Sequence, residues 1–244
     1  LVHGTFGEEF AKLIPEVRKE LGSDADDVLF ELALMQGKAL NWNSRLSSWD
    51  VSRQKMRSVF DRHDFAFKWT FAEFEGATAL YSWCLDQLTD AYGGIARLLD
   101  ETGAPELGDG EAGRLERQVT VLQGSAASLT LPDGSVTHIC MDPPYYDNVM
   151  YAKLADYFYV WEKRTLGRLV PGYFHDDLTD KDNEAVANPA RFATMGKRKK
   201  ELADLDYEAK MTAIFAEAKR VLADGGVLSV MFTHKRAEAW DTLG

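Results

Sequence analysis

Apolar positions along the chain recur mainly at helical spacing. In the first helical stretch they fall at Phe10, Leu13, Ile14, Val17 and Leu21, which form one face of a helix. Gly22 is expected to end this helix, and Ser23 with Asp26 predicts a capped start for the next. The pattern predicts helices over Glu8–Leu21, Asp24–Leu40, Ala77–Leu99, Tyr151–Leu166 and Tyr207–Leu222.

Short apolar runs predict the strands. Val136–Met141 is mostly apolar and is expected to be a buried strand of an α/β sheet. Val227–Phe232 follows a predicted helix and the turn residues Asp224–Gly226, which is the helix-to-strand step of a doubly wound sheet. Gln118–Gln123 predicts a further short strand. The fold class expected from this order is α/β.

Two stretches lack a regular pattern. Residues 41–74 are irregular, with basic side chains interleaved among eight aromatic ones. Such a segment is either a stacking groove for single-stranded or flipped bases, or part of the core with solvated basic residues, and the sequence leaves both interpretations open. Asp100–Gly113 is rich in glycine and acid and is expected to be a linker or an exposed loop. The predicted domains are therefore 1–113, helical and aromatic, and 114–244.

Composition limits the class of protein. With 244 residues the chain is long enough for a sizeable core, and no apolar run reaches the ~20 residues of a membrane span. The two cysteines, Cys84 and Cys140, lie far apart, which predicts neither a disulfide framework nor a metal site and fits a reducing cytoplasm. The net charge of −11 argues against a uniformly basic nucleic-acid-binding surface but permits a local one.

The loop after Val136–Met141 carries the clearest chemistry. It reads Asp142-Pro143-Pro144-Tyr145 and stands at the carboxyl end of a predicted strand, where open α/β sheets bind ligands. Two prolines cannot donate to a sheet and hold the preceding residues extended, so the loop should be stiff. These residue types suit an exocyclic amino group. The carboxylate of Asp142 and the carbonyl of Pro143 would accept its two hydrogens, and the ring of Tyr145 would stack on the base.

This loop resembles the catalytic motif of the amino-methyltransferases, which transfer a methyl group from S-adenosylmethionine to adenine N6 or cytosine N4. An aspartate in the first position is the form usually seen with adenine. The continuation through Tyr146, Asp147, Asn148 and the aromatic segment Tyr151–Trp161 is similar to the zinc-ribbon adenine-specific DNA methylase family of bacterial phage-defence loci. The resemblance implies a Rossmann-like S-adenosylmethionine-dependent methyltransferase, with Asp142, Pro143, Pro144 and Tyr145 as its catalytic residues.

Further residues follow from their places around this loop. Asn148 and Tyr151 lie nearest to it and are expected, with Tyr146, to line the base pocket. Lys197, Arg198, Lys199 and Lys200 form the densest basic cluster, which is either a solvated face or a contact to phosphates. The turn Gly124-Ser125-Ala126 resembles the family's segment beside the adenosine of the cofactor, and a tight turn that needs small side chains explains it equally well.

The sequence also lacks one expected part. Methyltransferases of this kind carry a Phe-x-Gly-x-Gly loop that cradles the methionine end of the cofactor, and no such segment occurs here. The chain begins with Leu rather than Met, so it is expected to be a fragment, or a subunit whose partner supplies the cofactor half. The predicted function is N6-adenine methylation of DNA by S-adenosylmethionine. The alternatives are a non-catalytic recognition or scaffold subunit of a defence complex, and an enzyme that acts on cytosine N4 or on RNA.

Overall fold

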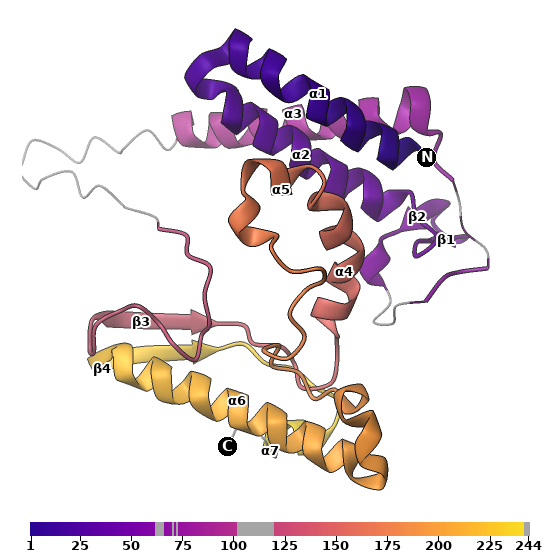
Figure 1. The fold of residues 1–244 in the computed structure, drawn as a ribbon. Coiled ribbons are helices and arrows are strands. Elements are labelled where there is room, and N and C mark those ends of the chain that lie inside the picture. Colours follow the sequence, from indigo (N-terminus) through magenta and orange to yellow (C-terminus); the bar gives the residue numbers. More distant parts are fainter. Residues whose placement is uncertain (62–65, 70, 72, 102–119, 242–244) are drawn as a thin grey trace, which may run out of the picture. The chain divides into compact units, whose positions relative to one another are not determined.

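The computed structural model describes residues 1–61, 66–69, 71, 73–101 and 120–241, and over them the protein is mixed α/β, mostly helical, with a small parallel sheet (Figure 1). The chain divides into two units. Unit 1 comprises Leu1–Gly113 and Ala152–Asp180, and unit 2 comprises Arg114–Tyr151 and Lys181–Gly244. The division expected from the sequence differs in one respect, because residues 152–180 pack with the N-terminal helices.

Three long helices form most of unit 1: α1 (Val2–Leu21), α2 (Ala25–Trp42) and α3 (Tyr81–Glu101). All three are predicted by the apolar pattern, although α1 begins earlier than expected. Gly22 ends α1 with a φ of 58°, a conformation that favours glycine. The predicted capping of α2 is wrong. Its N-cap is Asp24, no side chain caps it, and the Asp26 carboxylate instead accepts a hydrogen bond from Arg18 at 2.9 Å.

The core of unit 1 lies between these helices and the chain segment that returns after residue 151. Phe10 of α1 and Leu29 and Ala33 of α2 pack on Leu166 of α5 (Leu166–Leu169). Farther along α2, a second cluster joins it to α3; its buried members are Met35, Ala39, Leu80 and Cys84. Thr165 donates a fully buried hydrogen bond to Gln36 at 2.9 Å, so polar as well as apolar contacts attach the returning segment to α2.

Shorter elements complete unit 1. Strands β1 (Ser48–Asp50) and β2 (Lys55–Arg57) form an antiparallel hairpin within the stretch expected to be irregular. Helix α4 (Tyr151–Glu162) ends four residues before the predicted Leu166. The short helices are Gly22–Asp24, Val59–Asp61, a π-helix at Gly76–Leu80, and Pro171–Tyr173. Most of the predicted linker 100–113 lies outside the described residues.

Unit 2 contains a strand–helix–strand unit. Strand β3 (Val136–Met141) has the predicted bounds and pairs in parallel with β4 (Leu222–Val230), which directly follows helix α6 (Lys199–Val221). The helix Pro189–Arg198 precedes α6, and α7 (Ala237–Asp241) follows β4. The core beneath the strand ends consists of Tyr146, Ala187, Tyr207, Met211 and Ala239.

The pairing of β4 with β3 is irregular at the start of β4. Val136 pairs with Leu222, but His138 pairs with Val227, so β4 holds extra residues between these two pairs. Gly225, at a φ of 78°, lies in this irregular stretch. Asp224–Gly226 therefore lie in an irregular stretch between the paired positions, and regular pairing starts at Val227, where the strand was expected to begin.

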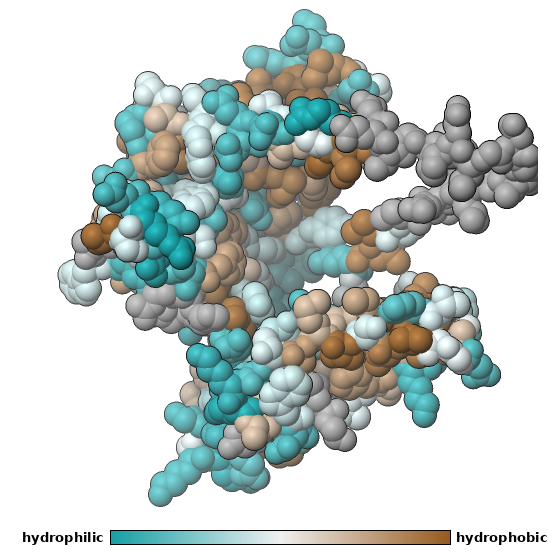
Figure 2. All heavy atoms as spheres, turned by 180° about the vertical axis from the view of Figure 1, so that it is seen from behind, coloured by the Kyte–Doolittle hydropathy of each residue, from teal (hydrophilic) through white to brown (hydrophobic). Residues whose placement is uncertain are grey.

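Two expectations about the sheet are wrong. Strand β3 is not buried, because its residues are exposed or half-buried throughout. Thr120–Gln123, the described part of the third predicted strand, are not in a strand. Within the described residues the parallel sheet thus has two strands. Figure 2 shows apolar side chains at the surface of the unit that contains them, and Val227 and Met231 are more than half exposed.

Candidate functional site

The Asp142–Tyr145 loop begins where β3 ends. Because β3 and β4 are parallel, their carboxyl ends meet at one edge of the sheet, where ligands bind in α/β folds. A backbone hydrogen bond from Met231 to Met141, 2.9 Å long, continues the pairing one residue beyond β4. Beyond it, the ring of Tyr145 contacts the edge of Phe232, with 5.4 Å between centroids. The loop is therefore attached to the segment that follows β4.

The two predicted amine acceptors differ in their surroundings. Asp142 is exposed, whereas Pro143 is buried. No group among the described residues donates a hydrogen bond to the carbonyl of Pro143. Buried backbone carbonyls are nearly always paired, so this one stands out as an acceptor that an N–H of a ligand would satisfy.

Pro144 fixes the loop in place. Its carbonyl accepts two hydrogen bonds, one from the backbone N–H of Tyr146 at 3.0 Å and one from the hydroxyl of Tyr207 at 2.9 Å. Tyr207 belongs to α6 and is fully buried. The loop is thus held by the helix that covers the sheet, and the stiffness expected from the two prolines has a second cause.

Tyr145 is half-buried and lies beside Asp142. The interaction of its hydroxyl with the Asp142 carboxylate raises the pKa of Tyr145, and burial adds to this effect. The phenol therefore stays neutral at physiological pH and can donate a hydrogen bond to Asp142. The arrangement orients the Asp142 carboxylate, which the sequence analysis predicts as an acceptor for an amino group.

Tyr146 has a packing position. It adopts a φ of 57°, which is rare for a tyrosine, and its side chain is only 4% exposed. Its hydroxyl donates to Asp204 at 2.5 Å, and its carbonyl accepts from the N–H of Ala187 at 3.0 Å. Burial, followed by Asp204, raises the pKa of Tyr146. This predicted pocket residue is thus engaged within the core of unit 2.

An ion-pair network that the sequence analysis missed lies next to the loop. Asp147 accepts a hydrogen bond from His234 at 3.1 Å and also pairs with Arg236, whose guanidinium lies over the ring of Tyr146. The side chain of His234 is only 8% exposed. Residues 147 and 234 are 87 positions apart, so local sequence patterns give no signal of this contact. The network joins the loop after β3 to the segment after β4.

The remaining predicted site residues lie on the surface. Asn148 is exposed and Tyr151 is 51% exposed. Gly124, Ser125 and Ala126 are exposed and form the predicted turn, which the Ser128 N–H closes onto the Ser125 carbonyl at 3.0 Å.

The basic cluster is exposed as well. It spans the start of α6 and consists of Lys197, Arg198, Lys199 and Lys200, with Arg198 paired to Glu201 at 3.2 Å. Tyr207, which touches the loop, lies eight residues after Lys199, or about 12 Å along the helix axis. The cluster and the loop are therefore carried by the same unit.

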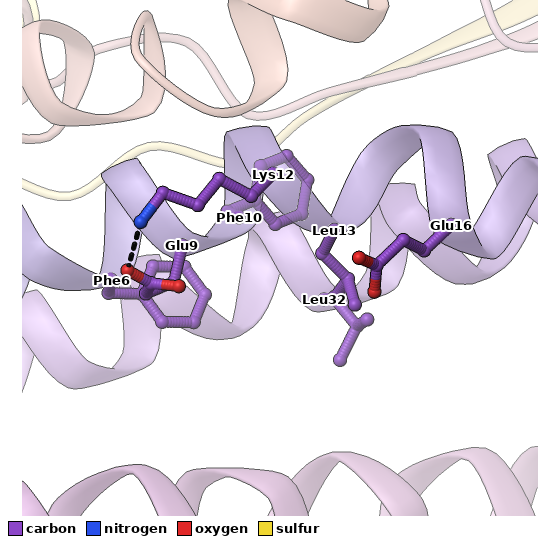
Figure 3. A pocket seen from close by; sticks show the side chains of 7 residues that line it. All are labelled: Phe6, Glu9, Phe10, Lys12, Leu13, Glu16 and Leu32. Atoms are coloured by element: carbon purple, nitrogen blue, oxygen red, sulfur yellow. Dashed lines mark hydrogen bonds and ion pairs between the residues drawn. The ribbon is translucent and has the colours of Figure 1, made fainter.

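A pocket in unit 1 is lined by none of the predicted site residues. It lies on α1 and α2, has a volume of about 340 Å³, and carries an ion pair between Lys12 and Glu9 of 2.7 Å (Figure 3).

In the part of the chain that the structure describes, no cluster of three His, Cys, Asp or Glu side chains is arranged to hold a metal, and no helix is long and apolar enough to cross a membrane.

Comparisons with known protein families, with curated proteins and with solved structures find no match to this chain. The interpretation of the site therefore depends on its own residues and geometry.

Proposed function

We propose that this chain takes part in N6-adenine methylation of DNA, as a fragment or subunit of an S-adenosylmethionine-dependent methyltransferase in restriction-modification or phage defence. The observation that carries the proposal is the pair of acceptors at the end of β3. There an exposed carboxylate, Asp142, stands next to the carbonyl of the buried residue Pro143, which accepts no hydrogen bond from any described residue.

These residues act on the amine of the base. Asp142 accepts one of its hydrogens and Pro143 the other, which turns the nitrogen lone pair toward the methyl donor and increases its electron density. Tyr145 offers a ring face to the base, a contact that contributes about 1–3 kcal/mol in comparable base–aromatic stacking. Since an amine inside a duplex cannot reach such a loop, the adenine must first be flipped out of the helix.

The described residues do not fit the whole cofactor. Gly124-Ser125-Ala126 forms an exposed small-residue turn suited to border an adenosine, but no glycine-rich loop is present for the methionine end. When bound, S-adenosylmethionine supplies a sulfonium-activated methyl group. In this proposal it is held mainly by a further cofactor-binding half or by a partner subunit, and this chain supplies the amine-binding loop.

A second candidate is a non-catalytic recognition or scaffold subunit of a defence complex. The missing glycine-rich loop favours it, because a subunit that only binds a base has no need of the cofactor. Cytosine N4 and RNA bases are the alternative acceptors for an active enzyme, and the aspartate at position 142 favours adenine over cytosine.

The proposal is tested in cells that carry the native gene. Mass spectrometry of nucleosides from genomic DNA is expected to find N6-methyladenine that disappears when the gene is deleted and returns when it is restored. A product that consists only of N4-methylcytosine, or DNA unchanged by the deletion, would show that the assignment is wrong.

A further inference from the structure

Aromatic side chains are exposed around the β1–β2 hairpin of unit 1. Trp49 on β1 is 44% exposed, and Trp69, close by in sequence, is 98% exposed. By contrast, Trp42 and Phe74 pack against Trp83 of α3, with 6.2 and 5.7 Å between centroids. The aromatic segment is therefore partly core, whereas Trp49 and Trp69 leave much of their ring surface open to solvent, which is compatible with a binding surface.

The segment around Trp69 is held next to the start of the hairpin. The N–H of Lys68 donates to the carbonyl of Arg45 at 2.8 Å, and the guanidinium of Arg45 lies over the rings of Phe67 and Phe71. The exposed tryptophans on both sides of this contact thus belong to one region of unit 1.

The acidic side chains at the hairpin, Asp50 and Asp61, form hydrogen bonds and ion pairs with neighbouring residues. Asp50 is only 5% exposed, accepts hydrogen bonds from Ser52 and from the N–H of Arg53, and pairs with Arg57 at 3.2 Å. Arg57 also pairs with Asp61 at 3.2 Å. Hydrogen bonds from Ser52 and from the backbone N–H of Arg53, together with the positive charge of Arg57, lower the pKa of Asp50. Asp50 is therefore ionised, and Arg57 neutralises its charge.

Arg53 and Lys55 are the two basic side chains of the hairpin that can contact a ligand. Both are exposed, and neither side chain pairs with any group in the described part of the chain. They line a polar pocket of about 590 Å³ together with Trp42, Asp50, Ser52, Met56, Arg57, Ser58 and Asp61. Figure 2 shows hydrophilic side chains gathered at this end of unit 1, at the left edge of the view. The volume lies within the range of about 300–1,000 Å³ typical of ligand sites.

The local charge is opposite to that of the whole chain. Among the described residues between 45 and 69, five cations (Arg45, Arg53, Lys55, Arg57 and Lys68) and two acids (Asp50 and Asp61) give +3, whereas the chain carries −11. Because only the field near the phosphates matters for nucleic-acid binding, an acidic protein with such a patch attracts a polyanion at this place.

We propose that the hairpin binds single-stranded DNA that passes around its edge, with Arg53 and Lys55 on backbone phosphates and Trp49, which projects from the opposite face to Lys55, stacking on a base. Unpaired cations combined with exposed aromatic rings are the features by which proteins hold unpaired strands. The inference deepens the proposed function by naming a contact surface for the substrate. It has its own test, since DNA binding is measured without methyl transfer.

The test measures fluorescence anisotropy of a labelled single-stranded oligonucleotide with the full chain over a series of salt concentrations. Arg53→Glu combined with Lys55→Glu is expected to weaken binding at least about tenfold and to lower the slope of log K against log salt by about 1.4, the value for two lost phosphate contacts. Trp49→Ala is expected to weaken binding by about fivefold or more while leaving the slope unchanged.

Matched controls decide the outcome. Lys19→Glu combined with Lys219→Glu makes the same change in net charge at two exposed lysines on α1 and α6. It is expected to weaken binding less than about threefold, because neither lysine belongs to the hairpin and charges that do not contact the DNA are screened by salt. Circular dichroism checks that each variant folds, and Arg53→Gln with Lys55→Gln provides a milder pair.

Three results would overturn the inference: no binding by the unaltered chain at low salt, equal loss in the hairpin and control variants, or a Trp49→Ala variant that binds normally. If the hairpin variants lose DNA binding as predicted but the native gene produces no methylated base, the surface stands and the enzymatic proposal fails.

Discussion

Tyr207 shows how one buried hydroxyl determines the position of the candidate site. It lies on α6, is fully buried, and donates to the carbonyl of Pro144 at 2.9 Å. The carbonyl of the preceding proline then has no partner among the described residues. The hydroxyl of Tyr207 is the second donor to the Pro144 carbonyl, beside the N–H of Tyr146, and it ties the loop to α6.

Tyr207→Phe removes only that hydroxyl. A typical intramolecular hydrogen bond contributes about 0.5–1.5 kcal/mol, so the variant is expected to lower the free energy of unfolding by about 1 kcal/mol in urea titrations. The control is Tyr173→Phe, because Tyr173 is 55% exposed and should tolerate the loss. Equal stability of the two variants would contradict the role given to Tyr207.

The sequence predicts part of this residue-level picture. The Asp142–Tyr145 loop is recognisable because proline acts on its immediate neighbours, and the structure places it at the end of β3 as expected. The network of Asp147, His234 and Arg236 escapes prediction, since its members are 87 and 89 residues apart. The burial of Tyr146 cannot be predicted from local sequence either, because it depends on contacts with α6, which lies far along the chain.

At the scale of elements, the start of the π-helix before α3 is set by Glu75. Its carboxylate accepts hydrogen bonds from the N–H groups of Ala77, Thr78 and Ala79 and from the Thr78 hydroxyl, at 2.6–3.1 Å. These bonds, with those from Thr78 first, lower the pKa of Glu75 from 4.5 to about 2. A glutamate thus performs the capping usually assigned to shorter side chains.

A pH dependence follows from this depressed pKa. The stabilisation is fully present above about pH 4.5, the unfolded pKa, and is lost as the pH falls through about 2, the folded pKa. Urea unfolding between these limits is expected to show stability falling less steeply with acid in Glu75→Ala than in the unaltered protein. Glu208→Ala, at an exposed glutamate of α6, serves as the control. Identical pH profiles for all three proteins would exclude this role for Glu75.

The long helices are predictable because each presents an apolar face with a regular period. The ends of helices and strands are harder to predict. Helix α6 begins at Lys199, eight residues before the expected start, and β4 begins at Leu222, although its regular pairing with β3 starts only at Val227. The exposure of β3 also escapes prediction, since an apolar run has the same pattern whether or not other strands and helices cover it.

At the scale of the whole molecule, the proposed function has the chain supply an amine-binding loop without a complete cofactor site. Isothermal titration calorimetry with S-adenosylmethionine is therefore expected to detect weak binding or none. Micromolar affinity of this chain alone would show that the glycine-rich loop is dispensable and that the account of a separate cofactor half is wrong.

The organisation into two units is only partly visible in the sequence. The return of residues 152–180 to unit 1 rests on contacts such as the Thr165–Gln36 hydrogen bond, which joins residues 129 positions apart. Local patterns contain no information on such pairs, whereas the step from α6 to β4 in unit 2 joins consecutive elements and is predictable from the sequence.

The central claim is that Asp142 holds the amine that is methylated. It is tested most directly by introducing Asp142→Ala into the native gene and measuring N6-methyladenine in genomic DNA. Glu208→Gln, at an exposed position of α6, is the control. The account predicts that Asp142→Ala abolishes the methylated base while the purified variant keeps nearly normal affinity for DNA, because phosphate contacts dominate that affinity. Methylation at the control level in Asp142→Ala would contradict the account and favour the scaffold function.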